Sequence, residues 1–382
     1  MKKIVAFLLC VFLLCSCSKA EEAKSNEERD FAAMFLSYIE LMELSASGDF
    51  KESFNTVTEN CEKLNITDMF IHVRAMSDSL YPSAYYPLTD WAKDQNFDVM
   101  GFMIEACHKR NMRFHAWINP YRISSSVNDL EKISPESPAH SLSFGIGDTE
   151  KGLYFDPSNE EVRRLILDSI REITARYSVD GIHFDDYFYP TDSPYFDLNS
   201  YNAYCSQTVK PLSLDNFRRA NVNSLISGVK SVLLNADRPI LFSVSPAADI
   251  ENNENHLYAD VDYWCESGFI DAVMPQLYFG FDYPNDNFKF ENLLNGWIEY
   301  LSGSDCLFYP VLAPYKLDTD QRPDAIEWEN GTSIIARQIK LIKENQITNG
   351  FALYSYSYVF GDGDNYTKQK ENIKKAVKEE KI

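Results

Sequence analysis

Short apolar runs alternate with longer amphipathic stretches along most of the 382-residue chain. The short runs are typical of buried strands, and the longer stretches carry apolar residues at helical spacing. The expected strands cover residues 34–41, 67–74, 113–118, 179–184, 239–245, 270–276, 306–312 and 350–356. The expected helices cover residues 50–64 (with Asp49 as N-cap), 99–110, 159–177, 214–234, 290–301 and 334–345. Eight strands that alternate with helices predict an α/β fold, a (β/α)8 TIM barrel with long βα loops.

An open, doubly wound sheet is the alternative architecture for this alternation. That fold would bring a glycine-rich phosphate-binding turn after an early strand, and the sequence has none.

Polar and aromatic residues gather at the carboxyl ends of seven of the expected strands. The clusters are Arg74, Asp78 and Tyr81; Trp117, Asn119, Tyr121 and Arg122; Asp185 and Asp186; Glu251, Asn252 and Asn253; Gln276 and Tyr278; Tyr315 and Lys316; and Tyr356 and Tyr358. In a parallel barrel these ends meet on one face, where active sites are built.

Residues 178–190 are the most informative stretch of the chain. An apolar run over residues 179–184 leads directly to two adjacent carboxylates, Asp185 and Asp186, followed by three aromatic residues and Pro190. Proline prevents further ladder pairing, so the acids are expected at the end of a strand. Carboxylates beside aromatic rings suit sugar chemistry, since acids transfer protons and ring faces stack on pyranoses. A solvated loop with two surface acids is the alternative.

Composition narrows the choice of partners. A hydrophobic content of 45% is ample for one large core, and 23 Tyr and 25 Phe exceed what packing alone needs. The formal charge of −21 argues against electrostatic binding of nucleic acid or an anionic surface. A neutral or amine-bearing polymer fits this charge better.

Five cysteines lie beyond the first 17 residues: Cys61, Cys107, Cys205, Cys265 and Cys306. Their wide spacing and odd number argue against a dense disulfide framework or a zinc site. We expect buried free thiols, no metal and no cofactor.

Residues 1–17 resemble a lipoprotein signal peptide. Lys2 and Lys3 precede an apolar segment, and residues 14–17 (Leu-Cys-Ser-Cys) resemble a bacterial lipobox in which Cys17 is lipidated. An ordinary signal peptide is the alternative. The predicted organisation is a signal segment at 1–17, a polar tether at 18–32, a barrel at 33–365 and a charged C-terminal helix or tail at 366–382. The predicted location is the bacterial cell envelope, with a lipid anchor in the membrane.

Several longer motifs resemble the glycosyl hydrolase-like 10 family over about residues 33–360. The motifs are residues 72–74, 80–83, 115–122 (His-Ala-Trp-Ile-Asn-Pro-Tyr-Arg), 154–157, 180–190, 258–261 and 275–278. The resemblance implies a TIM barrel that acts on a bacterial polysaccharide, and some relatives cleave peptidoglycan glycan strands stripped of their peptides.

Asp185 is the first candidate for a direct catalytic role. Residues 181–185 are similar to the strand-four segment of alpha-amylase-type barrels, whose final aspartate is the nucleophile. Those enzymes carry the acid after strand five, where Glu251 is the first glutamate of this chain. Residues 311–315 contain no carboxylate, which disfavours a nucleophile on strand seven.

Residues 180–185 also resemble the strand-four signature of family 18 chitinases, but the catalytic glutamate of that signature falls at Tyr187. In a substrate-assisted mechanism Asp185 and Asp186 would act as orienter and acid, and Glu251 would bind substrate. The sequence leaves these mechanisms open, and with them a non-catalytic glycan-binding lipoprotein.

The predicted substrate-binding residues combine hydrogen-bonding groups with ring faces that stack on sugars. They are Arg74, Asp78, Trp117, Asn119, Tyr121, Arg122, Tyr187, Asn253, Gln276, Tyr278 and Tyr356. His115 and His183 alternate with apolar neighbours, and we expect them to be hydrogen-bonded core residues.

Overall fold

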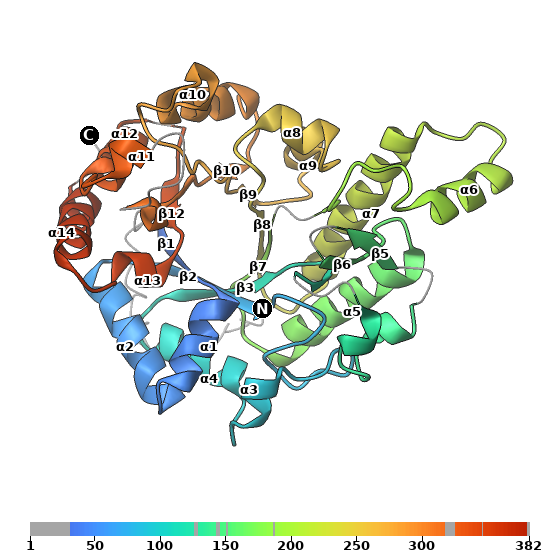
Figure 1. Ribbon diagram of the computed structural model, residues 1–382, viewed down its shortest axis with the longest axis horizontal. Helices are drawn as coiled ribbons and strands as arrows, with labels where there is room; N and C mark the ends of the chain where they lie inside the picture. The colour runs from blue at the N-terminus through green and yellow to red at the C-terminus, as the bar shows by residue number, and fades with distance from the viewer. Residues whose placement is uncertain are drawn as a thin grey trace, which may run out of the picture.

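The computed structural model describes residues 31–125, 129–142, 146–149, 152–185, 188–317, 325–345 and 347–379. A ring of parallel strands forms the centre, and helices surround it (Figure 1). The ring contains β1 (Phe31–Leu36), β2 (Asp68–Arg74), β3 (Arg113–Ile118), β7 (Gly181–Phe184), β8 (Leu241–Val244), β9 (Ala272–Val273), β10 (Leu307–Phe308), β11 (Val311–Leu312) and β12 (Gly350–Leu353). The order is β10-β9-β8-β7-β3-β2-β1-β12-β11.

The ring closes because β10 and β11 are two parts of one strand. The amides of Tyr309 and Val311 donate to Val273 and Pro275 on one side. On the other side the carbonyl of Pro310 accepts from Ala352. Pro310 has no N–H to donate, so the ladder is interrupted there without opening the barrel. Eight strands therefore enclose the interior, as the alternation in the sequence predicts.

The helices form the outer layer, and shorter elements decorate the loops. The α-helices are α1 (Tyr38–Ala46), α2 (Phe50–Lys63), α3 (Asp90–Lys93), α4 (Val99–His108), α5 (Glu160–Arg176), α6 (Leu198–Gln207), α7 (Leu214–Leu234), α8 (Ile250–Asn255), α9 (Val261–Glu266), α10 (Phe290–Tyr300), α11 (Ala325–Trp328), α12 (Ile334–Glu344), α13 (Tyr356–Val359) and α14 (Asp364–Lys378). The 3-10 turns are η1 (Leu130–Lys132), η2 (Pro138–His140), η3 (Asp286–Phe288) and η4 (Pro314–Lys316). A small antiparallel sheet, β4 (Arg122–Ser124), β5 (Ile146–Thr149) and β6 (Gly152–Phe155), follows β3.

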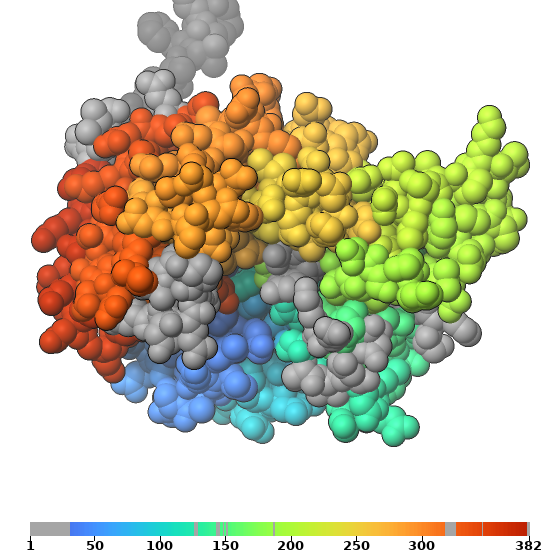
Figure 2. All heavy atoms as spheres, turned by 45° about the horizontal axis from the view of Figure 1, so that its top comes forward, coloured from blue at the N-terminus to red at the C-terminus, as the bar shows by residue number. Residues whose placement is uncertain are grey.

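The segment that carries α6 projects from the barrel (Figures 1 and 2). At the end of the described chain α14 packs against α12, with Ile373 and Ala376 fully buried. Among the described residues, none of the helices has the length and apolar character needed to cross a membrane.

The first expected strand is too long at its C-terminal end. β1 ends at Leu36, and α1 begins two residues later, because Ser37 and Glu40 form a capping box. The same Glu40 carboxylate accepts hydrogen bonds from Ser355 Oγ (2.9 Å) and Ser357 N (2.7 Å). It therefore joins the first helix to the end of the last strand.

Alternation along the strands separates two apolar layers. Residues of one parity face the helices, and residues of the other parity, such as Phe35, Phe70, Trp117 and Ala352, pack together inside the barrel. We call the opening at the carboxyl ends of the strands the mouth. Because the alternation continues past each strand, the residue two positions after the last inward-facing residue lies at this mouth.

The opposite end of the barrel holds a buried ionic cluster around Asp68. His115 Nε2 lies 2.6 Å and Arg113 Nε 2.8 Å from Asp68 Oδ1. Burial favours the neutral acid, but the hydrogen bonds and charges of His115 and Arg113 outweigh it and lower the pKa of Asp68. The ring of His115 stacks on Phe70, with 4.2 Å between ring centroids. The remaining space is small, and a Cβ on Gly181 would overlap His115 Nδ1.

This crowding predicts opposite effects of two glycine substitutions. Gly181→Ala should lower the free energy of unfolding by about 1–3 kcal/mol or more, because the methyl group displaces His115. Gly296 lies inside α10, with open space where a Cβ would be. Gly296→Ala should therefore raise the free energy of unfolding by about 0.5–1 kcal/mol. Urea unfolding of both variants checks this, and equal stability of the two would contradict the described packing.

Candidate active site

Asp185 lies at the mouth, directly after β7 and two residues beyond the inward-facing His183. Its side chain is 8% exposed. Gln276, which follows β9, donates from Nε2 to Asp185 Oδ1 (3.1 Å) and to the carbonyl of Ser245 (3.1 Å). Gln276 thus links the Asp185 carboxylate to the end of the neighbouring strand β8.

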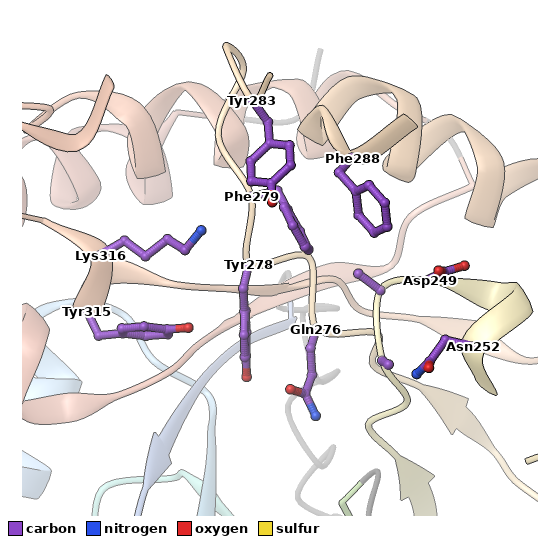
Figure 3. A pocket seen from close by; sticks show the side chains of 11 residues that line it. Asp249, Asn252, Gln276, Tyr278, Phe279, Tyr283, Phe288, Tyr315 and Lys316 are labelled. Atoms are coloured by element: carbon purple, nitrogen blue, oxygen red, sulfur yellow. The ribbon is translucent and has the colours of Figure 1, made fainter. Parts of the chain in front are cut away.

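Gln276 also lines a cavity of about 490 Å³ (Figure 3). Loops after β8, β9 and β11 build its walls. It is lined by Ala247, Ala248, Asp249, Asn252, Gln276, Tyr278, Phe279, Tyr283, Phe288, Tyr315 and Lys316. Figure 3 shows Tyr278, Tyr315 and Lys316 on one side, with Asp249 and Asn252 on the other. The volume and the mixture of ring faces with a few polar groups are typical of a small-molecule or sugar site.

Aromatic rings connect this cavity to the centre of the mouth. Tyr278 and Tyr354 stack with centroids 5.8 Å apart, and Tyr315 meets both rings edge-on at 5.7 and 5.9 Å. Trp117 in turn meets Tyr354 edge-on at 6.2 Å. The result is a continuous series of aromatic contacts across the ends of four strands, β3, β9, β11 and β12.

Buried polar atoms without a hydrogen-bond partner gather beside Trp117. They include Trp117 Nε1, His72 Nε2 and Asn119 Oδ1. The rings of His72 and Trp117 stack at 3.2 Å between centroids. Tyr38 N donates to His72 Nδ1 (3.2 Å), so the proton of the neutral imidazole is on Nε2. Asn119 lies close enough to His72 to influence its imidazole, so Trp117 Nε1 is the donor of this group that a ligand or water can bind, since buried polar groups rarely stay unpaired.

His72 and His183 are uncharged at neutral pH. Burial, and to a smaller extent the charge of His115, hold the pKa of His183 well below its ordinary value. Burial and the nearby guanidinium of Arg122 do the same for His72. His183 Nδ1 lies 2.8 Å from Ser243 Oγ, as expected for a hydrogen-bonded core histidine.

Arg74 and Asp78 lie away from the cavity lining. The register shifts between His72 and Arg74, so Arg74 pairs with the outward-facing Ile118. Its guanidinium stacks on Tyr86 at 4.6 Å. Asp78 is largely buried in the same loop region, and burial raises its pKa. These two residues shape the loop after β2.

Asn119, Tyr121 and Arg122 form the buried base of the loop after β3. Asn119 Nδ2 donates to Ala75 O (3.3 Å), and Tyr121 is fully buried, which raises the pKa of its hydroxyl. Arg122 begins β4, pairs with Tyr154 and lies close enough to influence His72. Asn119 and Arg122 therefore belong to the surroundings of the mouth.

Asn253 and Tyr356 support the site from behind. Asn253 accepts from Ala247 N and donates to Ala247 O, both at 2.9 Å, so it fixes the cavity wall after β8. Tyr356 OH accepts from Asn60 Nδ2 (2.9 Å), and its ring stacks on Phe360. It contacts the outer helical layer, and Tyr354 is the tyrosine at the mouth.

The carboxylate that lines the cavity after β8 is Asp249. Glu251 lies in α8, is exposed and is not among the lining residues. Asp249 is the N-cap of this helix and accepts from Glu251 N (3.1 Å). Asp186, Tyr187 and Cys17 lie outside the described residues.

Lys316 is an unusual lining residue, because it is only 3% exposed. Its ammonium lies over the rings of Phe279 (5.1 Å) and Trp328 (5.9 Å), which favours a cation in this position. In the part of the chain that the structure describes, no group of three or more His, Cys, Asp or Glu side chains is placed to hold a metal ion.

The sequence prediction missed Asp249, Tyr283, Phe279 and Tyr354 as site residues. Alternation identifies Tyr354, since it lies two positions beyond Ala352 and so faces the mouth. The other three lie on loops, where the sequence carries no periodic signal of side-chain direction.

Comparison with known proteins agrees with this architecture. The family described as "Glycosyl hydrolase-like 10" matches residues 33–303. Glycosyl hydrolase YngK of Bacillus subtilis (strain 168) is 29% identical over 328 residues, covering 80% of this chain and 63% of that protein. The chain thus spans less than two thirds of YngK. Glycosyl hydrolase DigH of Escherichia coli (strain K12) is 28% identical over 333 residues, covering 79% of this chain and 74% of that protein.

Solved structures share the fold at low sequence identity. The PgaB (BpsB) glycoside hydrolase domain from Bordetella bronchiseptica has a TM-score of 0.60 at 11% identity and covers 89% of this chain and 98% of that one. The catalytic domain of beta-amylase from Paenibacillus polymyxa has a TM-score of 0.60 at 10% identity, with 92% and 100% covered. The predicted TIM-barrel fold is confirmed.

The two neutral histidines predict a dependence of stability on pH. His72 and His183 take up protons only when the chain unfolds, so stability falls as the pH drops below the unfolded-state pKa of about 6.5. Each contributes a slope of up to about 1.4 kcal/mol per pH unit in this range. His183→Gln should remove one such contribution. Urea unfolding between neutral and mildly acidic pH measures the slope, and an unchanged slope in the variant would contradict a neutral His183.

Proposed function

Because the chain belongs to the glycosyl hydrolase-like 10 family, we propose that it hydrolyses O-glycosidic bonds of a bacterial polysaccharide at the mouth of the barrel. The observation that carries this proposal is the position of Asp185. Its carboxylate is hydrogen-bonded to Gln276, which also lines an aromatic cavity of about 490 Å³.

Asp185 is the carboxylate that acts on the reacting sugar. The side-chain N–H of Gln276 donates to this carboxylate, and such a hydrogen bond favours the ionised form that a nucleophile or general base needs. The neutral His183 lies one inward position before it on the same strand, so it supplies no competing positive charge.

A second carboxylate is needed for a retaining or inverting mechanism. Asp249 lines the cavity, which favours it over the exposed Glu251 on the same loop. Asp186, adjacent in sequence, is the donor in the substrate-assisted alternative. Measuring the turnover of the Asp185→Asn, Asp249→Asn and Asp186→Asn variants distinguishes the roles of the three acids.

The surroundings suit an uncharged sugar chain. Tyr278 and Tyr354 offer stacking surfaces, and Trp117 Nε1 offers a donor for a sugar oxygen. The formal charge of −21 disfavours polyanionic substrates. Peptidoglycan glycan strands are the first polymer to test, because the family resemblance of residues 115–122 and 180–190 implies them.

We place the protein in the cell envelope, attached to the membrane by a lipid on Cys17. The support is the basic, apolar and lipobox-like order of residues 1–17.

A glycan-binding protein without turnover is the second candidate function. The position of Glu251 favours this candidate, because the expected acid is exposed and does not line the cavity. Asp249 is the carboxylate that lines it. In that case the aromatic mouth would bind a glycan chain without cleaving it. Mass spectrometry of glycans after incubation discriminates the two: new reducing ends support hydrolysis, and tight binding without them supports the binder.

Asp185→Asn should lower the turnover of a cleaved glycan at least about 10²-fold, because the amide can neither attack nor accept a proton. Asp237→Asn, an exposed aspartate after α7, is the matched control and should keep wild-type turnover. Reducing-end release measures the rates, and thermal melting verifies folding. Near-normal turnover of a folded Asp185→Asn variant would remove Asp185 from the chemistry.

Cys17→Ser should release the protein from the membrane. Without the thiol no thioether to a lipid can form, so the variant is expected in the soluble fraction while wild type sediments with membranes. Fractionation with immunodetection measures this distribution. Equal membrane association of the two proteins would contradict the anchor.

A further inference from the structure

The loop after β9 carries the aromatic part of the cavity wall. Phe279 and Tyr283 both line the cavity, and their rings meet edge-on with centroids 5.0 Å apart. Phe288, at the end of η3, contacts these two rings with centroid distances of 5.2 and 6.0 Å. Figure 3 shows the three rings close together in the upper part of the view. Tyr283 is partly exposed, so its ring is accessible to a sugar.

The carboxylate of Glu327, in the short helix α11, holds the backbone of this loop. Glu327 Oε1 accepts from Phe281 N (2.7 Å), and Oε2 accepts from Asp282 N (2.9 Å). The two N–H groups lie in sequence between Phe279 and Tyr283. Hydrogen bonds to an ionised acceptor are stronger than bonds between neutral groups, so this carboxylate is an effective anchor for the loop.

The packing of the loop against Glu327 is close. A Cβ on Gly280 would overlap Glu327 Oε2, so a side chain at this position would displace the carboxylate. Two further bonds hold the start of the loop: Phe290 N donates to Gly280 O (2.9 Å), and Gln338 Nε2 donates to Phe279 O (2.8 Å). Glu327 thus fixes the segment that lies between this anchored start and Tyr283.

We propose that Glu327 is a positioning residue for glycan binding, which keeps the loop in the conformation that places Phe279 and Tyr283 at the cavity. The proposal rests on the proposed function, since it explains how the same cavity binds the polysaccharide. Glu327 is not among the described residues that line the cavity, and Asp185 is bonded to Gln276 rather than to this loop. Loss of Glu327 should therefore weaken glycan binding and leave the bond-breaking step unchanged.

Amide hydrogen exchange of the full-length protein tests the contact without any glycan. The amides of Phe281 and Asp282 are hydrogen-bonded in the wild type and should become at least about 10-fold faster to exchange in Glu327→Ala. Glu329→Gln is the matched control, because Glu329 is an exposed glutamate directly after α11, and it should exchange like the wild type. Unchanged exchange in Glu327→Ala would overturn the proposal, whether or not the protein cleaves glycans.

Kinetics with peptidoglycan glycan strands stripped of their peptides test the consequence for binding. In reducing-end assays, Glu327→Ala should raise KM about 10-fold and keep kcat within about twofold of the wild type. Glu327→Gln keeps one acceptor oxygen, so its KM should lie between those of the wild type and Glu327→Ala. A folded Glu327→Ala variant with the KM of the wild type, or one whose kcat falls as far as its kcat/KM, would overturn the positioning role.

Gly280→Ala tests the same contact from the side of the loop. The added methyl group should displace the Glu327 carboxylate and also raise KM. In the Glu327→Ala background the methyl group has room, so Gly280→Ala should add no further increase. Additive effects of the two substitutions would contradict the assigned contact. Absence of wild-type turnover would refute the proposed hydrolysis, and the exchange measurement would still decide the role of Glu327.

Discussion

The split seventh strand closes the barrel, and this closure brings the inward-facing side chains at the strand ends together at the mouth. Tyr309 and Val311 donate to the β9 side, while the carbonyl of Pro310 accepts from Ala352 of β12. Because the ring is closed, every second residue of each strand faces the same interior. Asp185, Gln276 and Tyr354 converge because each lies two residues beyond an inward neighbour. An open sheet of the same strands would not bring β9 and β12 together across the seventh strand.

The interior beneath the mouth combines rings with neutral polar groups. His183, Trp117 and Phe35 pack edge-on against one another, and Asp68 at the far end carries its charge beside Arg113. Charge is thus compensated at the base, and the layer under Asp185 carries none at neutral pH. His72 and His183 therefore place no positive charge beneath Asp185, the carboxylate that we propose acts on the sugar.

Much of the fold could be predicted from sequence because it depends on periodicity. The helix N-capped by Asp49 and strand β3 appear where the pattern places them. The miss at residues 37–41 arises because Leu36–Leu41 reads as an apolar run, whereas the Ser37–Glu40 capping box and the bonds of Glu40 to Ser355 and Ser357 favour a helix. The tertiary contact of Glu40 with Ser355 and Ser357 thus helps to make this segment helical.

The site was less predictable, because side-chain direction at strand ends depends on single backbone irregularities. The shift between His72 and Arg74 turns Arg74 onto Tyr86, which no pattern in residues 72–74 reveals. Asn253 resembles a ligand-binding residue in sequence but pairs with Ala247 on the backbone. Gln276 and Tyr278 lie at the carboxyl end of the expected strand 270–276, and both line the cavity after β9.

The most direct test is a crystal structure of the Asp185→Asn variant soaked with an oligosaccharide. We expect sugar rings against Tyr278 and Tyr354, with a glycosidic oxygen within hydrogen-bonding reach of residue 185. A glycan bound at another face of the barrel, with the mouth empty, would contradict the assignment of the active site.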